Sequence, residues 1–197
     1  MEYLLIISQA LWIIAPAYIA NGLAVFFGGG TPIDFGKNYK DKKRILGDGK
    51  TWRGLFIGTF LGMTGGFCFA VLAIFISRSE FSWLSFSDFG KFPIMIPIIF
   101  SICFGALAGD IIESFFKRRI GKKRGEDWIP FDQLDFILGV LFFCFLMSVI
   151  LQAIGATKEN WFYQNFTIYH ILALIIITPF FHLFANFAHK KAKSKSK

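Results

Sequence analysis

Residues 54–77 read GLFIGTFLGMTGGFCFAVLAIFIS, and none of these side chains carries a charge. A helix of about 20 apolar residues is long enough to cross the hydrocarbon core of a bilayer. Lipid offers no water to backbone amides, so a spanning segment has to be helical to satisfy its own hydrogen bonds. This stretch therefore predicts a transmembrane helix.

Four further charge-poor stretches of similar length lie on either side of it. All five together predict helices at about residues 4–27, 54–77, 92–119, 132–157 and 168–188. Composition agrees, because 55% of the 197 residues are hydrophobic and only 17% are charged, a balance that is rare in soluble domains of this length. We expect an all-α integral membrane protein with five transmembrane helices, in one domain over residues 1–189 and a basic tail over 190–197.

Basic residues gather in alternate loops. The loop after the first predicted helix carries seven of them, the loop after the third carries six, and the C-terminal tail adds five. The two remaining loops hold only Arg78, Lys91 and Lys158. Because short loops rich in Lys and Arg stay in the cytoplasm, we expect the N-terminus outside, and both basic loops and the C-terminus inside. The sequence predicts a multi-pass protein of the cell membrane.

The cysteines and histidines do not form a recognisable site. Cys68, Cys103 and Cys144 each stand alone in a different apolar stretch, which is typical of small buried hydrophobic side chains. The three histidines all lie in or after the last apolar stretch, far along the chain from the polar motifs. Acid–base catalysis by histidine is therefore not expected.

A polar stripe ends the helix predicted over residues 92–119. Its side chains are spaced i, i+3, i+4 and i+7 and share one helix face: Asp110, Glu113, Ser114 and Lys117. An acid this close to hydrocarbon is costly unless it pairs with a base, binds a cation or lines a wet cavity. One alternative is a Glu113–Lys117 ion pair that only eases the exit of the helix from the bilayer; the other is a cation site around Asp110.

The next predicted helix begins with two aspartates on one face of its first turn, Asp132 and Asp135. Asp132 lies two residues after Pro130 and is also a candidate N-cap, but a cap does not account for Asp135. About 20 residues join this helix to the previous one, so Asp110 can approach both aspartates. Carboxylates plus phosphate oxygens are ligands that Mg²⁺ prefers, so the sequence predicts a Mg²⁺ site formed by Asp110, Asp132 and Asp135.

The first basic loop contains the run GDGKTWRG at residues 47–54. Glycines let a backbone approach a ligand closely, and Lys50, Thr51 and Arg53 are suited to phosphates. The run is not a P-loop, because Arg44 stands where that motif requires glycine and no strand precedes it. The simpler alternative is a solvated basic turn that only sets the topology.

Three motifs together resemble a family of lipid enzymes. Gly-Asp-x-x-Glu-Ser-x-x-Lys-Arg, at residues 109–118, with the later Asp-x-x-Asp at 132–135, resembles the signature of CDP-diacylglycerol synthases. The runs at residues 29–34, 47–54 and 130–136 resemble more closely the archaeal CDP-archaeol synthases. The His-Gly-Gly that precedes the paired aspartates in the bacterial pattern is absent, which favours the archaeal branch. The resemblance covers essentially the whole chain.

The resemblance implies a Mg²⁺-dependent transfer of CMP from CTP to an isoprenoid ether-lipid phosphate, 2,3-di-O-geranylgeranylglycerol 1-phosphate. On this hypothesis Asp110, Asp132 and Asp135 bind the metal and act in catalysis with Lys117. The nucleotide-binding residues are expected to be Gly47, Asp48, Gly49, Lys50, Thr51, Arg53, Glu113, Ser114, Arg118 and Lys123. Neither a nucleic acid nor an obligate protein partner is expected.

Two alternatives stay open. The first is the same reaction with phosphatidate as the acceptor lipid. The second is a small ion transporter, since acids near a membrane often bind a transported ion. The transporter is disfavoured because the acids cluster at one predicted cytoplasmic edge, no predicted span carries a charge at its middle, and no inverted repeat is visible.

Overall fold

The computed structural model describes residues 2–123, 126 and 128–180. Over these residues the chain is helical and contains no strand, only two isolated β-bridges in the first loop. The elements, in chain order, are α1 (Glu2–Phe26), α2 (Trp52–Ser77), the 3₁₀ turn η1 (Ser82–Leu84), α3 (Met95–Arg119), α4 (Phe131–Ala153), the short α5 (Trp161–Asn165) and a last helix (Ile168–Phe180).

Four of these helices, α1 to α4, are long and apolar enough to cross a membrane. Their ends agree with the predicted spans to within about one helical turn. The fifth predicted span is described only over Ile168–Phe180, and the rest of it lies outside the described residues, as does the basic tail. The structure is therefore that of an all-helical integral membrane protein with four candidate spans.

The helices pack closely where glycines and alanines face one another. A Cβ atom on Gly58 would lie 2.7 Å from Ala24 Cβ, so α1 and α2 touch nearly backbone to backbone. Between α3 and α4 a Cβ on Gly109 would collide with the carbonyl oxygen of Asp135, and one on Gly139 with that of Gly105. Small residues at helix interfaces are typical of membrane proteins, where van der Waals contact drives association.

Large apolar side chains cover much of the outer surface of the bundle. Phe56, Phe60 and Phe75 on α2 and Phe142 on α4 are all more than 60% exposed. In water such exposure would be costly, whereas lipid chains solvate it. The pattern is therefore that of a bundle whose outside faces hydrocarbon.

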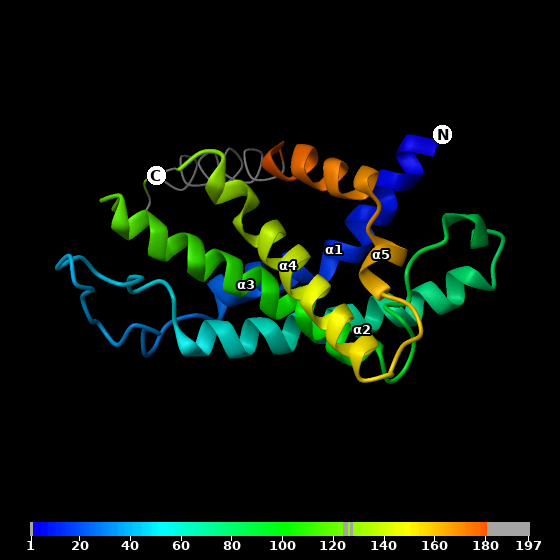
Figure 1. Ribbon diagram of the computed structural model, residues 1–197, viewed down its shortest axis with the longest axis horizontal. Helices are drawn as coiled ribbons and strands as arrows, with labels where there is room; N and C mark the ends of the chain where they lie inside the picture. Colours follow the sequence, from blue (N-terminus) through cyan, green and yellow to red (C-terminus); the bar gives the residue numbers. More distant parts are fainter. Residues whose placement is uncertain (1, 124–125, 127, 181–197) are drawn as a thin grey trace, which may run out of the picture.

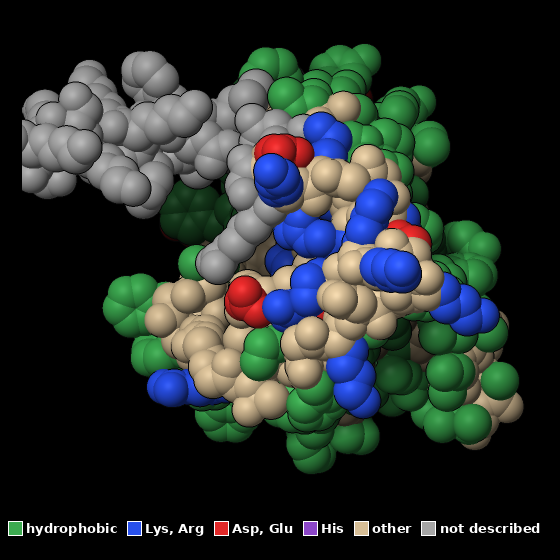
Figure 2. All heavy atoms as spheres, turned by 90° about the vertical axis from the view of Figure 1, so that its left-hand side faces the viewer, with side chains coloured by type: hydrophobic (Ala, Val, Ile, Leu, Met, Phe, Trp, Pro, Cys, Tyr) green, Lys and Arg blue, Asp and Glu red, His purple; other side chains and the backbone are tan. Residues whose placement is uncertain are grey.

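The opposite kind of surface covers one end of the bundle. The first loop, the end of α3 and the start of α4 lie toward the same side of the molecule (Figure 1). Viewed onto that side, lysine and arginine side chains gather above the helix ends and surround a hollow (Figure 2). The polar chemistry of the chain is thus concentrated at one end.

Candidate active site

A cavity of about 750 Å³ lies between the first loop and the facing ends of α3 and α4. This volume falls within the range of about 300–1,000 Å³ that is usual for small-molecule sites. Its acidic lining residues are Asp48, Asp110, Glu113, Asp132 and Asp135, and its basic ones are Arg44, Lys50, Lys117, Arg118, Lys122 and Lys123. Acidic and basic side chains in one cavity suit a ligand that carries both a metal ion and phosphates.

Three carboxylates form the acidic centre of this cavity. Asp110, Glu113 and Asp135 each offer an oxygen, and these atoms all lie within 4.8 Å of one another. The first two are one helical turn apart on α3, and the third comes from α4, held close by the contact between Gly109 and the Asp135 backbone. This acidic triad can bind a metal ion.

Asp132 lies beside the triad rather than within it. The alternative that Asp132 is the N-cap of α4 is wrong, because Pro130 holds the N-cap position and the helix begins at Phe131. Its Oδ2 instead accepts a hydrogen bond from the Trp128 backbone N–H at 2.9 Å. Sequence spacing alone placed Asp132 and Asp135 on one face, but the geometry puts Glu113 in the compact group.

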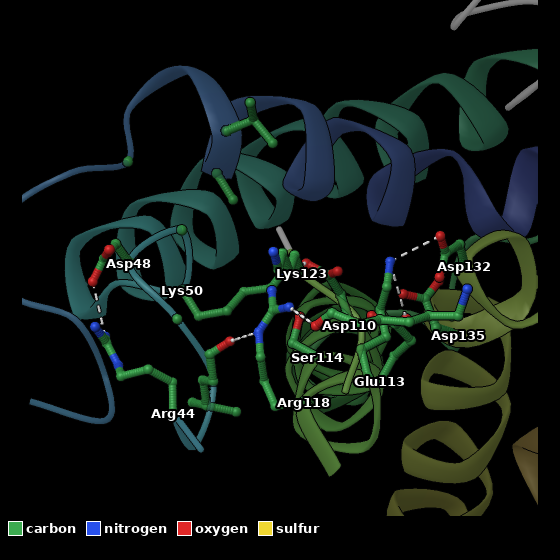
Figure 3. A pocket seen from close by; sticks show the side chains of 18 of the residues that line it. Arg44, Asp48, Lys50, Asp110, Glu113, Ser114, Arg118, Lys123, Asp132 and Asp135 are labelled. Carbon is green, nitrogen blue, oxygen red and sulfur yellow. Dashed lines mark hydrogen bonds and ion pairs between the residues drawn. The ribbon is translucent and has the colours of Figure 1, made fainter. Parts of the chain in front are cut away.

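Two lysines form ion pairs with these carboxylates, and Figure 3 shows one of them, Lys50 of the first loop, among the side chains that line the cavity. Lys50 Nζ, from the first loop, lies 2.5 Å from Asp110 Oδ2. Lys117 Nζ, from α3, lies 2.9 Å from Asp132 Oδ2 and 3.5 Å from Glu113 Oε1. The Glu113–Lys117 pair is therefore present, but it is part of a larger network that links both helices, not an isolated pair at the bilayer surface.

Two oxygens of this network are buried without a hydrogen-bond partner among the described residues, Glu113 Oε1 and Asp132 Oδ1. The first lies 3.5 Å from Lys117 Nζ in an ion pair, and the Glu113 and Asp132 carboxyl groups also interact with each other. Unsatisfied buried acceptors are uncommon and call for a ligand, an ion or water. An all-oxygen donor set of this kind suits a hard cation such as Mg²⁺, so the residues present fit the metal that the sequence predicted.

The first loop is held in shape by Asp34, whose side chain is fully buried. It accepts hydrogen bonds from the Arg44 guanidinium and from the backbone N–H groups of Gly36, Leu46 and Gly47. Burial raises the pKa of this carboxyl, but these hydrogen bonds outweigh burial and hold the pKa of Asp34 below its ordinary range. The loop is thereby fixed at the point where it meets the cavity.

Asp34→Asn is expected to destabilise the first loop by about 1–3 kcal/mol at neutral pH, since the donors around it lose an anionic acceptor. The pKa of Asp34 is lower in the folded loop than its ordinary value. Between these two pKa values the opened loop binds more protons than the folded loop, so wild-type stability falls as the pH drops below about 4. The difference between the two proteins should therefore shrink in acid. Hydrogen exchange of the loop amides at neutral and at low pH measures it; a difference that stays constant with pH contradicts the assignment.

Arg44 and Arg118 line the cavity and also hold the first loop in place. Arg44 Nη2 joins Asp34 to Asp48, at 2.9 and 2.8 Å. Arg118 Nε donates to Leu46 O at 3.0 Å and ties the loop to α3. Neither Arg44 nor Lys122 was predicted to line a site, because a run of basic residues carries no signal for which of its members point inward.

The other predicted residues fall into two groups. Gly47, Asp48, Gly49, Ser114 and Lys123 line the cavity with those already described. Thr51 and Arg53 do not line it. The buried Thr51 hydroxyl instead accepts a hydrogen bond from Gly54 N at 3.1 Å and caps α2, and Arg53 is exposed in the first turn of that helix.

A second cavity, of about 360 Å³, adjoins the carboxylates on the α3–α4 side. Its walls are almost entirely apolar and include Ile112, Phe116, Leu138 and Phe142. Glu113 and Asp135 line both cavities. A charged cavity and an apolar one therefore meet at the same two acids.

Apolar helices with such a paired polar and apolar site define an integral membrane protein that can bring a water-soluble and a lipid-soluble ligand together. The comparisons with known proteins agree, since the family model "CarS-like: CDP-archaeol synthase" matches residues 3–196. The chain belongs to the CDP-archaeol synthase family, a family of cytidylyltransferase enzymes.

Curated relatives and one solved structure extend this result. The chain is 43% identical to the CDP-archaeol synthase of Methanosarcina mazei over 182 residues, which cover 87% of this chain and 91% of the relative. It is 38% identical to that of Pyrococcus horikoshii, covering 95% and 94% of the two chains. It is also similar to a structure described as an intramembrane enzyme for archaeal membrane lipids biosynthesis, with 32% identity and a TM-score of 0.69 over 92% of this chain and 94% of the other.

Proposed function

We propose that this chain transfers the CMP moiety of CTP to 2,3-di-O-geranylgeranylglycerol 1-phosphate and so forms unsaturated CDP-archaeol and pyrophosphate. Membership of the CDP-archaeol synthase family over nearly the whole chain carries the proposal. The meeting of a charged cavity with an apolar one at Glu113 and Asp135 supports it, because the two substrates differ in the same way.

The chemistry requires charge neutralisation more than proton transfer. A lipid phosphate oxygen attacks the α-phosphorus of CTP, and the bond from that phosphorus to the bridging oxygen breaks as pyrophosphate leaves. The attacking oxygen is already anionic at neutral pH, since a phosphate monoester carries a charge of about −1.5 to −2. No strong general base is therefore needed, and the main barrier is the approach of two anions.

Asp110 and Asp135 are the proposed metal ligands, together with Glu113 or Asp132. When bound there, Mg²⁺ would neutralise phosphate charge and polarise the α-phosphorus. The carboxylates would hold the ion at the junction of the two cavities. Their number exceeds what one ion and its phosphates need, and this leaves an acid for Lys117 to contact.

The basic side chains are proposed to hold the triphosphate. Lys50, Lys117 and Lys123 line the cavity from different walls and are suited to separate phosphates. Arg118 is already engaged with the loop, so it fixes the wall from which Lys50 extends. The backbone of Gly47 and Gly49, with Asp48, shapes the same wall; Gly47 has φ +118°, a conformation that favours glycine.

The apolar cavity between α3 and α4 is the proposed seat of the lipid chains. It is bounded by the carboxylates at one end, so a lipid lying in it presents its phosphate to the metal site. Half-exposed Leu138 lies in its wall. This arrangement lets the lipid enter from the bilayer while the nucleotide enters from water.

Leu138→Trp is expected to obstruct this cavity and to raise KM for the lipid phosphate about tenfold, while KM for CTP changes little. Leu146→Trp is the matched control, because Leu146 is a comparably exposed leucine of α4 that does not line the cavity. Steady-state kinetics with each substrate varied in turn measures both values. An equal rise in both KM values would place the lipid elsewhere.

We also propose the predicted membrane arrangement for the whole chain: one domain over residues 1–189, five spans, the N-terminus outside, and the basic tail and active site on the cytoplasmic side. The charge distribution among the loops supports it. Single cysteines placed in the first loop and in the loop after α2, in a background without Cys68, Cys103 and Cys144, test it. Only the loop after α2 should react with an impermeant thiol reagent in intact cells.

The reaction itself is tested with purified protein, radiolabelled CTP, Mg²⁺ and each lipid phosphate in detergent micelles. The geranylgeranyl ether lipid is expected to yield labelled CDP-lipid much faster than phosphatidate. A preference for phosphatidate would assign the bacterial type of substrate. Absence of transfer to any lipid, with uptake of an ion into vesicles, would support a transporter instead.

A further inference from the structure

Lys50 extends from a fixed backbone into the carboxylate cluster. Its carbonyl oxygen accepts a hydrogen bond from Ile33 N at 2.8 Å, and the next residue, Thr51, pairs with Pro32 in a β-bridge. The side chain itself is a flexible four-carbon stem with a mobile ammonium. It lines the large charged cavity, and its Nζ lies 2.5 Å from Asp110 Oδ2. The anchored backbone leaves the ammonium free to exchange one anion for another within that cavity.

The carboxylate cluster needs positive charge even when no substrate is bound. Asp110, Glu113 and Asp135 bring oxygens within 4.8 Å of one another, and like charges at such distances repel strongly in a partly buried site. Lys117 neutralises the Glu113 side of the cluster. Within the described part of the chain, Lys50 is the ion-pair partner of Asp110. One ammonium therefore supplies charge at an oxygen that a metal ion would use.

We propose that Lys50 competes with the divalent cation for Asp110 and that the triphosphate of the nucleotide relieves the competition. An ammonium bonded to Oδ2 and a cation bound to the same oxygen repel each other, so Lys50 lowers the affinity of the ligand-free protein for metal. Phosphate oxygens arriving in the same cavity offer the ammonium another anionic acceptor. Its transfer frees Asp110 for the metal. This inference rests on the proposed function, whose nucleotide and metal share the cavity.

The consequence is a coupling between the two ligands that one side chain carries. By thermodynamic reciprocity, nucleotide raises metal affinity by the same factor as metal raises nucleotide affinity. Direct contact between metal and phosphates supplies part of this coupling in any such site. The part of the coupling that Lys50 carries can be distinguished from this direct contact. Removing the ammonium strengthens binding of the metal alone and weakens binding of the nucleotide alone.

The test uses the full chain in detergent, with Mn²⁺ as the probe, no nucleotide and no lipid, and electron paramagnetic resonance to measure free and bound ion. Lys50→Met is expected to bind Mn²⁺ at least about fivefold more tightly than wild type, the lower end of usual coupling factors. Lys50→Arg keeps the charge and should stay near wild type. Adding Asp110→Asn to Lys50→Met should remove the gain, which places the ion at this cluster.

Lys123→Met is the matched control for general electrostatics. It removes the same charge from the same cavity, and the described residues give its ammonium no ion pair. An Mn²⁺ affinity that Lys123→Met raises as much as Lys50→Met does would overturn the proposal, as would a Lys50→Met protein with wild-type or weaker affinity. If Lys50→Met fails to fold, as judged by size-exclusion chromatography, Lys50→Gln carries the same expectation.

A second measurement addresses the coupling itself. CTP affinity is measured with and without Mn²⁺. The factor by which Mn²⁺ raises CTP affinity should be smaller in Lys50→Met than in wild type. An unchanged ratio contradicts the transfer of Lys50 to phosphate. The proposed function fails in a different way, by absence of CMP transfer in the wild-type protein, and that outcome leaves the Mn²⁺ measurements as they are.

Discussion

Asp135→Asn is expected to lower the rate of CMP transfer by about 10³-fold or more, since the variant loses charge at a position proposed to hold the metal. Asp135 is the only member of the acidic triad that comes from α4, so it joins that helix to the two acids on α3. Asparagine keeps the size of the side chain but not its charge. Binding of Mn²⁺ in the presence of CTP should weaken together with turnover, while the helical fold is kept.

The control for this variant lies at the other end of the bundle. Asp88→Asn removes a carboxylate that accepts a hydrogen bond from Gly90 N in the loop between α2 and α3, and its turnover should stay within about twofold of wild type. Asp132→Asn distinguishes the two possible sets of metal ligands, one with Asp132 and one with Glu113 as the third acid. Asp132 contacts Lys117 but lies outside the compact triad. Wild-type turnover of Asp135→Asn would remove the metal assignment.

Gly109→Ala is expected to lower turnover by about 10²-fold, although alanine carries no chemistry of its own. Its Cβ would collide with the carbonyl oxygen of Asp135, so α3 and α4 have to move apart. Overpacking of this kind costs about 1–3 kcal/mol in stability, and a displacement of about 1 Å at reacting groups can cost about 10² in rate. Metal affinity should fall as well, since the movement separates Asp110 from Asp135.

Gly22→Ala is the matched substitution, because nothing lies within 4 Å of a Cβ at Gly22, which is also in a helix. It should be neutral or slightly stabilising, since alanine favours helix over glycine by about 1 kcal/mol. Thermal unfolding, Mn²⁺ binding and turnover of both variants measure the effect. Full activity in Gly109→Ala would show that the helix spacing does not set the metal site.

Helix periodicity made much of the fold and site predictable. The spacing of Asp110, Glu113 and Lys117 fixes them to one face of α3, and the structure places all three at the same cavity. The spans over α1 to α4 were predicted from the absence of charge and are confirmed as apolar helices of spanning length. Local spacing is sufficient for such features because a helix relates near neighbours by a fixed geometry.

Features that depend on contacts between distant segments were not predictable. The role of Asp34 depends on hydrogen bonds to residues 44–47 across an irregular loop, which has no period to read. Which acid of α4 faces Asp110 depends on how α3 crosses α4, and this crossing follows from the Gly105–Gly139 contact. The apolar cavity likewise exists only once those two helices are packed.

Glu113 and Asp135 line both the charged and the apolar cavity, so the two products of the proposed reaction leave by different routes. Pyrophosphate can leave into water through the charged cavity by which the nucleotide entered. The liponucleotide, by contrast, leaves through the apolar cavity, so its cytidine headgroup has to pass Glu113 and Asp135 before the product diffuses into the leaflet. Release of this bulky product, rather than bond formation, is therefore the step that requires the largest movement of the cavity walls on α3 and α4.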